Sequence, residues 1–243
     1  MNNAGDVLWS KNIMAYYNSQ LLDVISTPDN GFVMMLTDNY GSGSTYAQLI
    51  RFDDAGSIIW KKDLKYSIGT PLYKSLSCNT NYICAAHDAY FSTPQERIGV
   101  DKFSMQTGEK IWSNRYAMDD GKQVYINRIF NINDTPYVFL NHFAPVDFMN
   151  PTYNTVMLKL DPDGKINQSF AVSANPVKLP TTWDVCDESP PTITLTPDFD
   201  FVMANKVYDG SKNGFNISRF LRDGSQVWSR NYDDFSKYSP YNI

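Results

Sequence analysis

Four polar residues occupy similar places along the chain, and their types could together bind a small ligand or an anion. Each follows an apolar run at a short distance, and they are Thr37, His87, His142 and Lys206. If the apolar runs are equivalent strands of stacked sheets, these side chains lie together at one end of the sheets. Polar groups that converge from several elements are typical of ligand sites. The alternative is that they are ordinary strand-end residues that face water.

No set of residues predicts a catalytic centre or a metal site. The chain has 2 histidines, and it contains no Gly-x-Ser-x-Gly turn, no phosphate-binding loop and no His-Glu-x-x-His pair. It also lacks the Cys-x-x-Cys pair that suits structural zinc. We therefore predict no catalytic residue, no metal and no cofactor. One enzymatic alternative stays open, because a glycosidase can hold its two carboxylates on separate loops.

The three cysteines, Cys78, Cys84 and Cys186, permit at most one internal disulfide. Cys78 and Cys84 flank an expected turn at 79–81, so they could face each other across a hairpin. Alternatively, Cys84 is a small buried hydrophobic residue, since another repeat has Met34 in its place. Both interpretations stay open at this point.

The composition restricts the class of protein. The 243 residues are 42% hydrophobic, which is enough for a sizeable core. The formal net charge is -5, so we expect no nucleic-acid partner and no anionic lipid surface. No apolar run approaches the roughly 18 residues of a membrane span, so no membrane insertion is expected. The first residues have neither the basic nor the apolar part of a signal peptide.

The strongest signal is a repeated segment in which a glycine is followed four residues later by tryptophan. Its glycines recur roughly every 50 to 60 residues, at Gly5, Gly56, Gly108, Gly164 and Gly224. The fourth copy has Gln168 in place of the tryptophan. Between consecutive copies lie strand-like runs rich in Val, Ile, Phe, Tyr and Thr, which are joined by turn residues such as Asn-Gly. This pattern is typical of a propeller built from four-stranded repeats.

We therefore predict a single all-β, propeller-like domain over residues 1–243. Its four repeats of four antiparallel strands are expected at 21–65, 72–118, 124–172 and 181–233, with an extra N-terminal strand at 6–13. The extra strand leaves three interpretations open. The chain is part of a larger wheel, or it closes as four blades with this strand at an edge, or its open edges pair with another chain.

The segment Phe103-Ser-Met-Gln-Thr-Gly-Glu-Lys-Ile-Trp112 resembles the repeat of quinoprotein-like (PQQ-type) propellers, and the resemblance extends over residues 5–233. It implies a propeller fold, which hosts many functions. In that family the repeat tryptophan docks one blade on the next, which implies this role for Trp9, Trp60, Trp112 and Trp228. The resemblance does not imply the quinone cofactor, because the adjacent cysteines and the calcium site of quinone-dependent dehydrogenases have no counterpart here.

Two insertions carry aromatic or methionine side chains of the kind that is enriched at interfaces. Residues 144–153 contain Phe148, Met149 and Tyr153, and residues 181–191 contain Trp183 beside acidic residues. We expect these four residues to contact a partner. The alternative for Trp183 is packing against the neighbouring blade.

These observations predict a non-enzymatic binding or scaffold module that mediates protein or glycan interaction. The resemblance and the abundance of Asn, Tyr, Ser and Thr favour a location outside the cell or in the cell envelope. One alternative is a carbohydrate-active enzyme with carboxylates on the blade-end loops. Another is a structural subunit that self-assembles through open strand edges by strand complementation.

Overall fold

The computed structural model describes most of the repeat region of the chain. The described residues are 10, 20–40, 44–64, 72–88, 96–117, 123–144, 152–172, 177–178, 192–208 and 213–233. These segments form strands and turns, and they contain no helix. The abundance of β-branched and aromatic residues accounts for this, because such side chains pack well on a pleated surface.

The strands form four antiparallel sheets, each built from consecutive strands in chain order. Sheet 1 contains β1 (Gln20–Ser26), β2 (Phe32–Tyr40), β3 (Ser44–Phe52) and β4 (Ile58–Leu64). Sheet 2 contains β5 (Leu72–Cys78), β6 (Tyr82–Asp88), β7 (Glu96–Ser104) and β8 (Lys110–Ala117). Sheet 3 contains β9 (Gln123–Ile132), β10 (Thr135–Ala144), β11 (Thr152–Leu160), β12 (Ile166–Ala171) and the short β13 (Val177–Lys178). Sheet 4 contains β14 (Thr192–Leu195), β15 (Phe201–Tyr208), β16 (Asn213–Phe220) and β17 (Gln226–Asp233).

This arrangement confirms the predicted all-β, propeller-like fold. Strand β13 was not predicted, and it pairs with the first residues of β11, beyond the end of β12. The extra N-terminal strand predicted at 6–13 lies outside the described residues, apart from Ser10, which is not in a strand.

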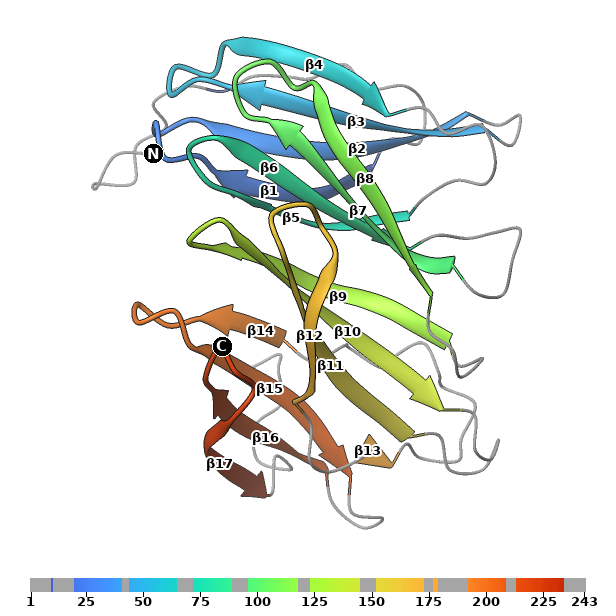
Figure 1. Ribbon diagram of the computed structural model, residues 1–243, viewed down its shortest axis with the longest axis vertical. Helices are drawn as coiled ribbons and strands as arrows, with labels where there is room; N and C mark the ends of the chain where they lie inside the picture. The colour runs from blue at the N-terminus through green and yellow to red at the C-terminus, as the bar shows by residue number, and fades with distance from the viewer. Residues whose placement is uncertain are drawn as a thin grey trace.

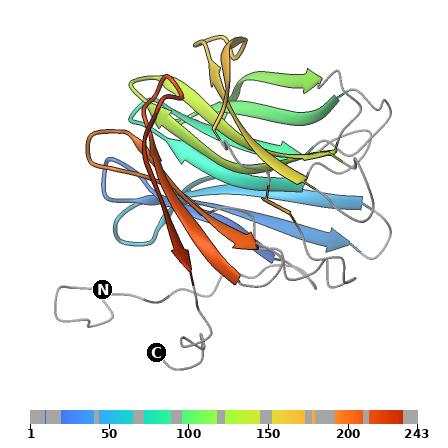
Figure 2. The ribbon, with the colours of Figure 1, turned by 90° about the horizontal axis from the view of Figure 1, so that it is seen from below.

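The four sheets are stacked face to face in chain order (Figure 1). Their first strands lie side by side, with β1 against β5, β5 against β9, and β9 against β14. Sheets 1 and 4 lie at opposite ends of the stack in Figure 1, and Figure 2, which looks along the stack, shows sheet 4 nearest to the viewer. The described part of the chain therefore does not bring its first and last sheets together.

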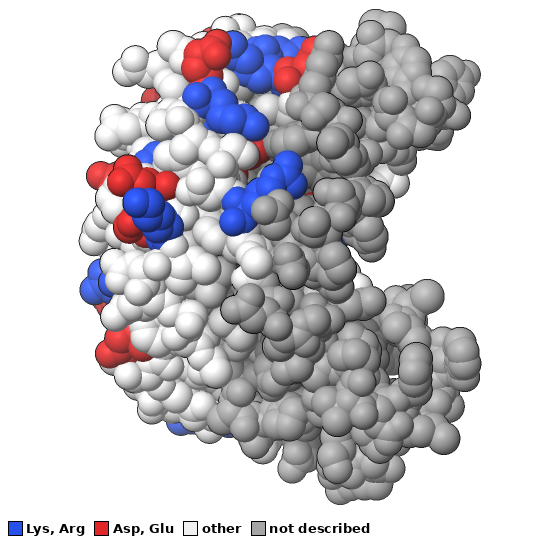
Figure 3. Space-filling model, turned by 45° about the vertical axis from the view of Figure 1, so that its right-hand side comes forward, with Lys and Arg blue, Asp and Glu red and all other residues white. Residues whose placement is uncertain are grey.

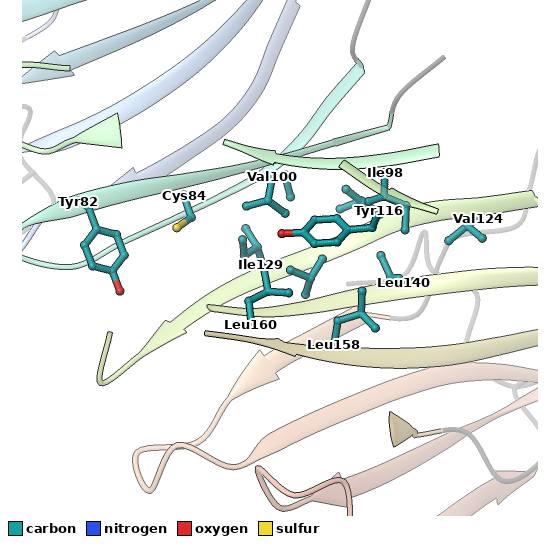
Figure 4. Packing of buried hydrophobic residues seen from close by; sticks show 13 residues of the cluster. Tyr82, Cys84, Ile98, Val100, Tyr116, Val124, Ile129, Leu140, Leu158 and Leu160 are labelled. Carbon is teal, nitrogen blue, oxygen red and sulfur yellow. The ribbon is translucent and has the colours of Figure 1, made fainter. Parts of the chain in front are cut away.

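Hydrophobic clusters fill the three spaces between neighbouring sheets. Figure 4 shows the cluster between sheets 2 and 3, in which the ring of Tyr116 lies between Val100 and Ile129. Sheet 2 has a neighbour on each face, and every residue of β6 is buried, as expected for strands that are covered on both sides. This burial fixes the strand register, because a slip of one residue would exchange the two faces.

The last hairpin of every sheet has the same local geometry. Its turn contains a glycine with φ between 68° and 82°, at Gly56, Gly108, Gly164 and Gly224. A residue with a Cβ atom adopts this conformation only with strain. The following strand contains a bulge, since Trp60 and Ile58 pair with consecutive residues of β3. The repeated Gly-x-x-x-Trp pattern is therefore the sequence of this turn and bulge.

Cys78 and Cys84 are free thiols. Ser77, rather than Cys78, pairs with Cys84, so the two thiols lie on opposite faces of sheet 2. Cys84 belongs to the cluster between sheets 2 and 3, and burial raises the pKa of its thiol to about 12. The Cys78 Sγ donates to the Ser26 carbonyl at 3.3 Å. Of the two interpretations of Cys84, the structure supports the buried hydrophobic residue.

Candidate functional site

The strand register separates the four predicted ligand residues into different rows. The matching positions of the four second strands are Thr37, Asp88, Asn141 and Lys206. His87 and His142 are each one residue outside this row. Because successive side chains of a strand point to opposite faces, His87 faces sheet 1 whereas Asp88 faces sheet 3. The side chains of His142 and Lys206 lie outside the described part of the chain, and their role as ligands stays a prediction.

Asp88 connects sheet 2 to sheet 3. Its Oδ1 accepts a hydrogen bond from the Ile126 amide at 2.8 Å, and the Lys74 Nζ lies 3.8 Å from its Oδ2. The residue is buried. Burial raises the pKa of its carboxyl to about 6, because the charged form loses hydration. Asp88 thus connects two blades, and its carboxylate loses its charge just below neutral pH.

We expect Asp88→Asn to raise the free energy of unfolding, relative to the native protein, by more at pH 7.5 than at pH 4.5. The folded state of the native protein binds a proton more tightly than the unfolded state does, so the native carboxyl contributes less stability as the pH rises toward 6. An asparagine keeps the acceptor for Ile126 and removes this dependence, for a difference on the order of 2 kcal/mol. Urea unfolding at both pH values measures it. An equal effect of the substitution at both pH values would contradict the assignment.

Among the described residues, three side chains with acid–base chemistry gather around Asp101. We define the Asp101 cluster as Tyr73, His87, Asp101 and Lys110. All three partners approach the same carboxylate oxygen. The Tyr73 hydroxyl donates to the Asp101 Oδ2 at 2.6 Å, Lys110 Nζ lies 3.3 Å from it, and His87 Nε2 lies 3.9 Å from it. Tyr, His, Asp and Lys are the residue types that serve in general acid–base catalysis, so access to solvent decides whether the cluster can act on a substrate.

The interior of the Asp101 cluster is closed to solvent. Asp101 is 0% exposed and His87 is 1% exposed. The imidazole of His87 packs directly over Gly99, where even a Cβ atom would collide with it. The His87 and Tyr73 rings meet edge to face, with 4.9 Å between their centroids. Burial lowers the pKa of His87 to about 4 against the opposing effect of Asp101. The cluster is therefore part of the packing between sheets 1 and 2.

Tryptophan and a neighbouring cation together join sheet 1 to sheet 2. Trp60 Nε1 and Arg51 Nη1 both donate to the Met105 carbonyl, at 3.0 and 2.6 Å. The Trp60 ring lies over Gly108, where a Cβ atom would be 2.8 Å from it. A side chain at this glycine would thus displace the ring. The contact combines a charged and a neutral donor on one carbonyl oxygen, and hydrogen bonds with an ionised donor are the stronger kind.

The same arrangement recurs between sheets 2 and 3. Trp112 Nε1 and Lys102 Nζ both donate to the Pro162 carbonyl, at 3.0 and 3.3 Å. Two residues beyond the tryptophan, Asn114 donates to the Asp163 carbonyl at 2.8 Å. At the preceding interface the matching residue is Lys62, which pairs with Glu109. Sheets 1 and 2 therefore each hold the glycine turn of the next sheet through three side chains.

The third interface uses a different side chain. Gln168 stands in the tryptophan position, and Phe170 lies against Gly224, where a Cβ atom would be 2.6 Å from the Phe170 Cβ. The aromatic contact has thus moved by two residues, which keeps it on the same face of the strand. The basic residue that donates beside each docked tryptophan was not predicted from the sequence. Its signal is a basic residue in the third strand of each sheet, at Arg51, Lys102, Lys159 and Arg219.

Most of the predicted partner contacts fall outside the described residues. These are Phe148, Met149, Trp183 and also the docking residue Trp9. Tyr153 lies in β11, and its backbone pairs with Val177 of β13, but its side chain is outside the described part. Trp228 is described and is 37% exposed. The partner-contact role of the first insertion and of Trp183 therefore stays a prediction.

Charges on the described surface are mixed in sign. Figure 3 shows basic and acidic side chains interspersed along the described part of one face. Among the described side chains, no group of three or more His, Cys, Asp and Glu residues is arranged to hold a metal ion. Within the same residues, no helix combines the length and apolar character that crossing a membrane requires.

Comparison with known proteins identifies the fold and no family. No protein-family model and no curated relative matches the sequence. Similar solved structures include the cobalt-substituted apocarotenoid oxygenase of Synechocystis, with a TM-score of 0.54 and 12% identity. Another is the puromycin-hydrolyzing peptidase of Mycobacterium tuberculosis, with a TM-score of 0.50 and 10% identity.

The extent of these alignments limits what they imply. They cover 86% and 88% of this chain, but 48% of the oxygenase and 32% of the peptidase. The chain thus spans about half the length of the oxygenase. At such identities the likeness shows a shared all-β, propeller-type architecture, and it assigns neither the PQQ-type family nor an activity.

Proposed function

We propose that this protein is a non-enzymatic propeller module that acts as a scaffold or binds a protein or glycan partner. The observation that carries the proposal is the burial of Tyr73, His87 and Asp101, the three inner residues of the Asp101 cluster. These acid–base groups are enclosed between two sheets, and only Lys110 at the edge of the cluster is exposed, with 39% of its side chain accessible. A catalytic group must reach its substrate within hydrogen-bond distance, and the interior of this cluster offers no such access.

Polar side chains that connect neighbouring blades support the same role. Asp23 Oδ2 accepts from the Leu76 amide at 2.7 Å, and Ser77 Oγ accepts from the Asn131 amide at 2.7 Å. Asp88 holds the Ile126 amide in the same way. Hydrogen bonds between blades make the frame more rigid. A rigid frame with long variable loops is a common way to present a binding surface.

The alternative is a carbohydrate-active enzyme with carboxylates on blade-end loops. A panel of glycans separates the two functions if the purified full chain is tested for both retention and product formation. We expect no product from any glycan, whether or not one is retained. Product formation that coelutes with the folded chain and disappears when the chain is unfolded would overturn the proposal. Retention without turnover identifies the ligand as a glycan, and its absence favours a protein partner.

A further inference from the structure

The outer face of sheet 4 repeats the docking residues that join the other blades. We define the sheet 4 face by the side chains of β15, β16 and β17 that are described and point away from sheet 3, namely Val202, Ala204, Phe215, Ile217, Arg219, Trp228, Arg230 and Tyr232. Arg219 pairs with Trp228 in the register, as Arg51 pairs with Trp60 and Lys102 with Trp112. Arg230 has the position of Lys62 and Asn114. All three docking positions are therefore present on this face.

The sheet 4 face is less buried than the equivalent faces of the other sheets. At the centre of those faces, the pairs Met35–Leu49, Ala86–Val100 and Phe139–Met157 are 1% exposed or less. The matching pair in sheet 4, Ala204 and Ile217, is only partly buried. Trp228 is 37% exposed and Tyr232 is 41% exposed. Aromatic rings gathered on an open sheet face are typical of an interaction surface.

Arg219, like Arg51, is held by an acidic residue of the preceding hairpin. Arg51 uses Nη2 to hold Asp29 at 2.5 Å and Nη1 to donate to the Met105 carbonyl. Arg219 uses Nε and Nη2 to hold Asp200, at 2.9 and 2.6 Å. An acidic residue from the preceding hairpin thus fixes both guanidinium groups. This fixation lowers the entropy cost of presenting a donor to a carbonyl oxygen.

We propose that the sheet 4 face docks a further four-stranded blade whose last hairpin turn carries a glycine at positive φ. The turn carbonyl of this partner blade accepts from Trp228 Nε1 and from Arg219, its glycine lies under the Trp228 ring, and Arg230 meets a carbonyl or an acidic side chain of the turn. The inference goes beyond the proposed function, because a further blade could extend a scaffold or an enzyme alike.

Charge and burial distinguish this partner from a second copy of the chain. Two sheet 4 faces packed together would oppose Arg219 and Arg230 with the same arginines, and like charges that face each other are unfavourable. The outer face of sheet 1 is a poor partner as well, because its residues Ile50 and Phe52 are already buried, with 1% of each exposed. The occupant is therefore a blade other than the four described sheets.

The test supplies such a blade to the full chain. A copy of residues 66–117 is inserted after Asp233, which matches the register in which sheet 1 leads into sheet 2. The copy is suitable because its turn is the one that docks on an Arg–Trp pair, Arg51 and Trp60. The probe is 5-fluorotryptophan ¹⁹F NMR, with Trp228 assigned by Trp228→Phe. We expect the Trp228 signal to lose its solvent isotope shift in the inserted protein.

The matched control is the same insertion with Gly108→Val in the copy only. The valine Cβ would enter the space of the docked ring, so we expect Trp228 to keep its solvent isotope shift there. Equal protection or equal exposure of Trp228 in both insertions would overturn the proposal. A disordered copy, detected by the loss of dispersed signals, would overturn it as well, because the face would have failed to support a blade that suits an Arg–Trp pair.

A second measurement uses the chain without an insertion. We expect Trp228→Ala to change the melting temperature by less than about 1 °C, whereas Trp60→Ala lowers it by several degrees. The Trp60 ring packs against the turn at Gly108, whereas Trp228 is 37% exposed and packs against no turn of the described residues. A loss for Trp228→Ala equal to that for Trp60→Ala would overturn the proposal. So would a dimer of the native chain that becomes monomeric with Trp228→Ala, since the occupant would then be a second copy.

Discussion

Replacing Asp101 with alanine is expected to lower the free energy of unfolding by about 3 kcal/mol. The carboxylate is fully buried, and its Oδ2 accepts from Tyr73 and lies within 3.3 Å of the Lys110 ammonium. Alanine would leave the Tyr73 hydroxyl without its acceptor between two sheets, and it would remove the counter-charge of Lys110. Urea unfolding at pH 7 measures the difference, with the slope of the transition as a check on two-state behaviour.

Asp163→Ala is the matched control for this prediction. Asp163 is an exposed residue of a hairpin turn in sheet 3, and its replacement should change the free energy of unfolding by less than about 0.5 kcal/mol. Tyr73→Phe should fall between the two, because it removes one partner and leaves the carboxylate. If Asp101→Ala were no more damaging than Asp163→Ala, the Asp101 cluster would not contribute to the stack as described.

Replacing Gly164 with valine is expected to cost about 3 kcal/mol of stability for two additive reasons. The φ of Gly164 is 79°, which a β-branched residue adopts only with strain. A Cβ atom there would also be 2.7 Å from the Trp112 ring, so the ring would have to leave the turn. The hydrogen bond from Trp112 Nε1 to the Pro162 carbonyl would then be lost. Thermal unfolding followed by circular dichroism measures the total effect.

Asn30→Ala isolates the backbone contribution to this effect. Asn30 has a φ of 64° in an exposed hairpin turn, so alanine there carries the strain of a left-handed conformation without a ring above it. We expect about 1 kcal/mol from that strain alone. The remainder of the Gly164→Val effect is then the contribution of the docked Trp112 and Asn114 side chains, which both lie against Gly164. Equal losses for the two variants would show that the ring contact contributes nothing.

The sequence was sufficient to predict the sheets, because their signals are local. The glycine turn and the strand bulge repeat with a fixed spacing, and the strands carry β-branched and aromatic residues throughout. The rows across the sheets were harder to predict. The apolar run before His87 is shifted by one residue relative to the run before Thr37, and a shift of one residue exchanges the two faces of a strand. A comparison of the cations in the third strands would have fixed the register.

The Asp101 cluster could not be predicted, because its members come from four different strands. Tyr73, His87, Asp101 and Lys110 lie on β5, β6, β7 and β8, and no spacing in the sequence indicates that they meet. The replacement of the tryptophan contact by Phe170 at the third interface could not be predicted either. Phe170 supplies there the contact that tryptophan supplies elsewhere, and a pattern search expects the aromatic residue at a fixed position.

The central claim is that the described acid–base groups are buried between sheets and stabilise their packing. An NMR titration of the His87 imidazole tests this claim most directly. The chain has 2 histidines, so His142→Gln leaves one imidazole to follow. Since burial lowers the pKa of His87 to about 4, we predict that its ring stays neutral as the pH falls from 8 to 5. An imidazole that titrates near the ordinary value of about 6.5 would place His87 in contact with solvent and contradict the account.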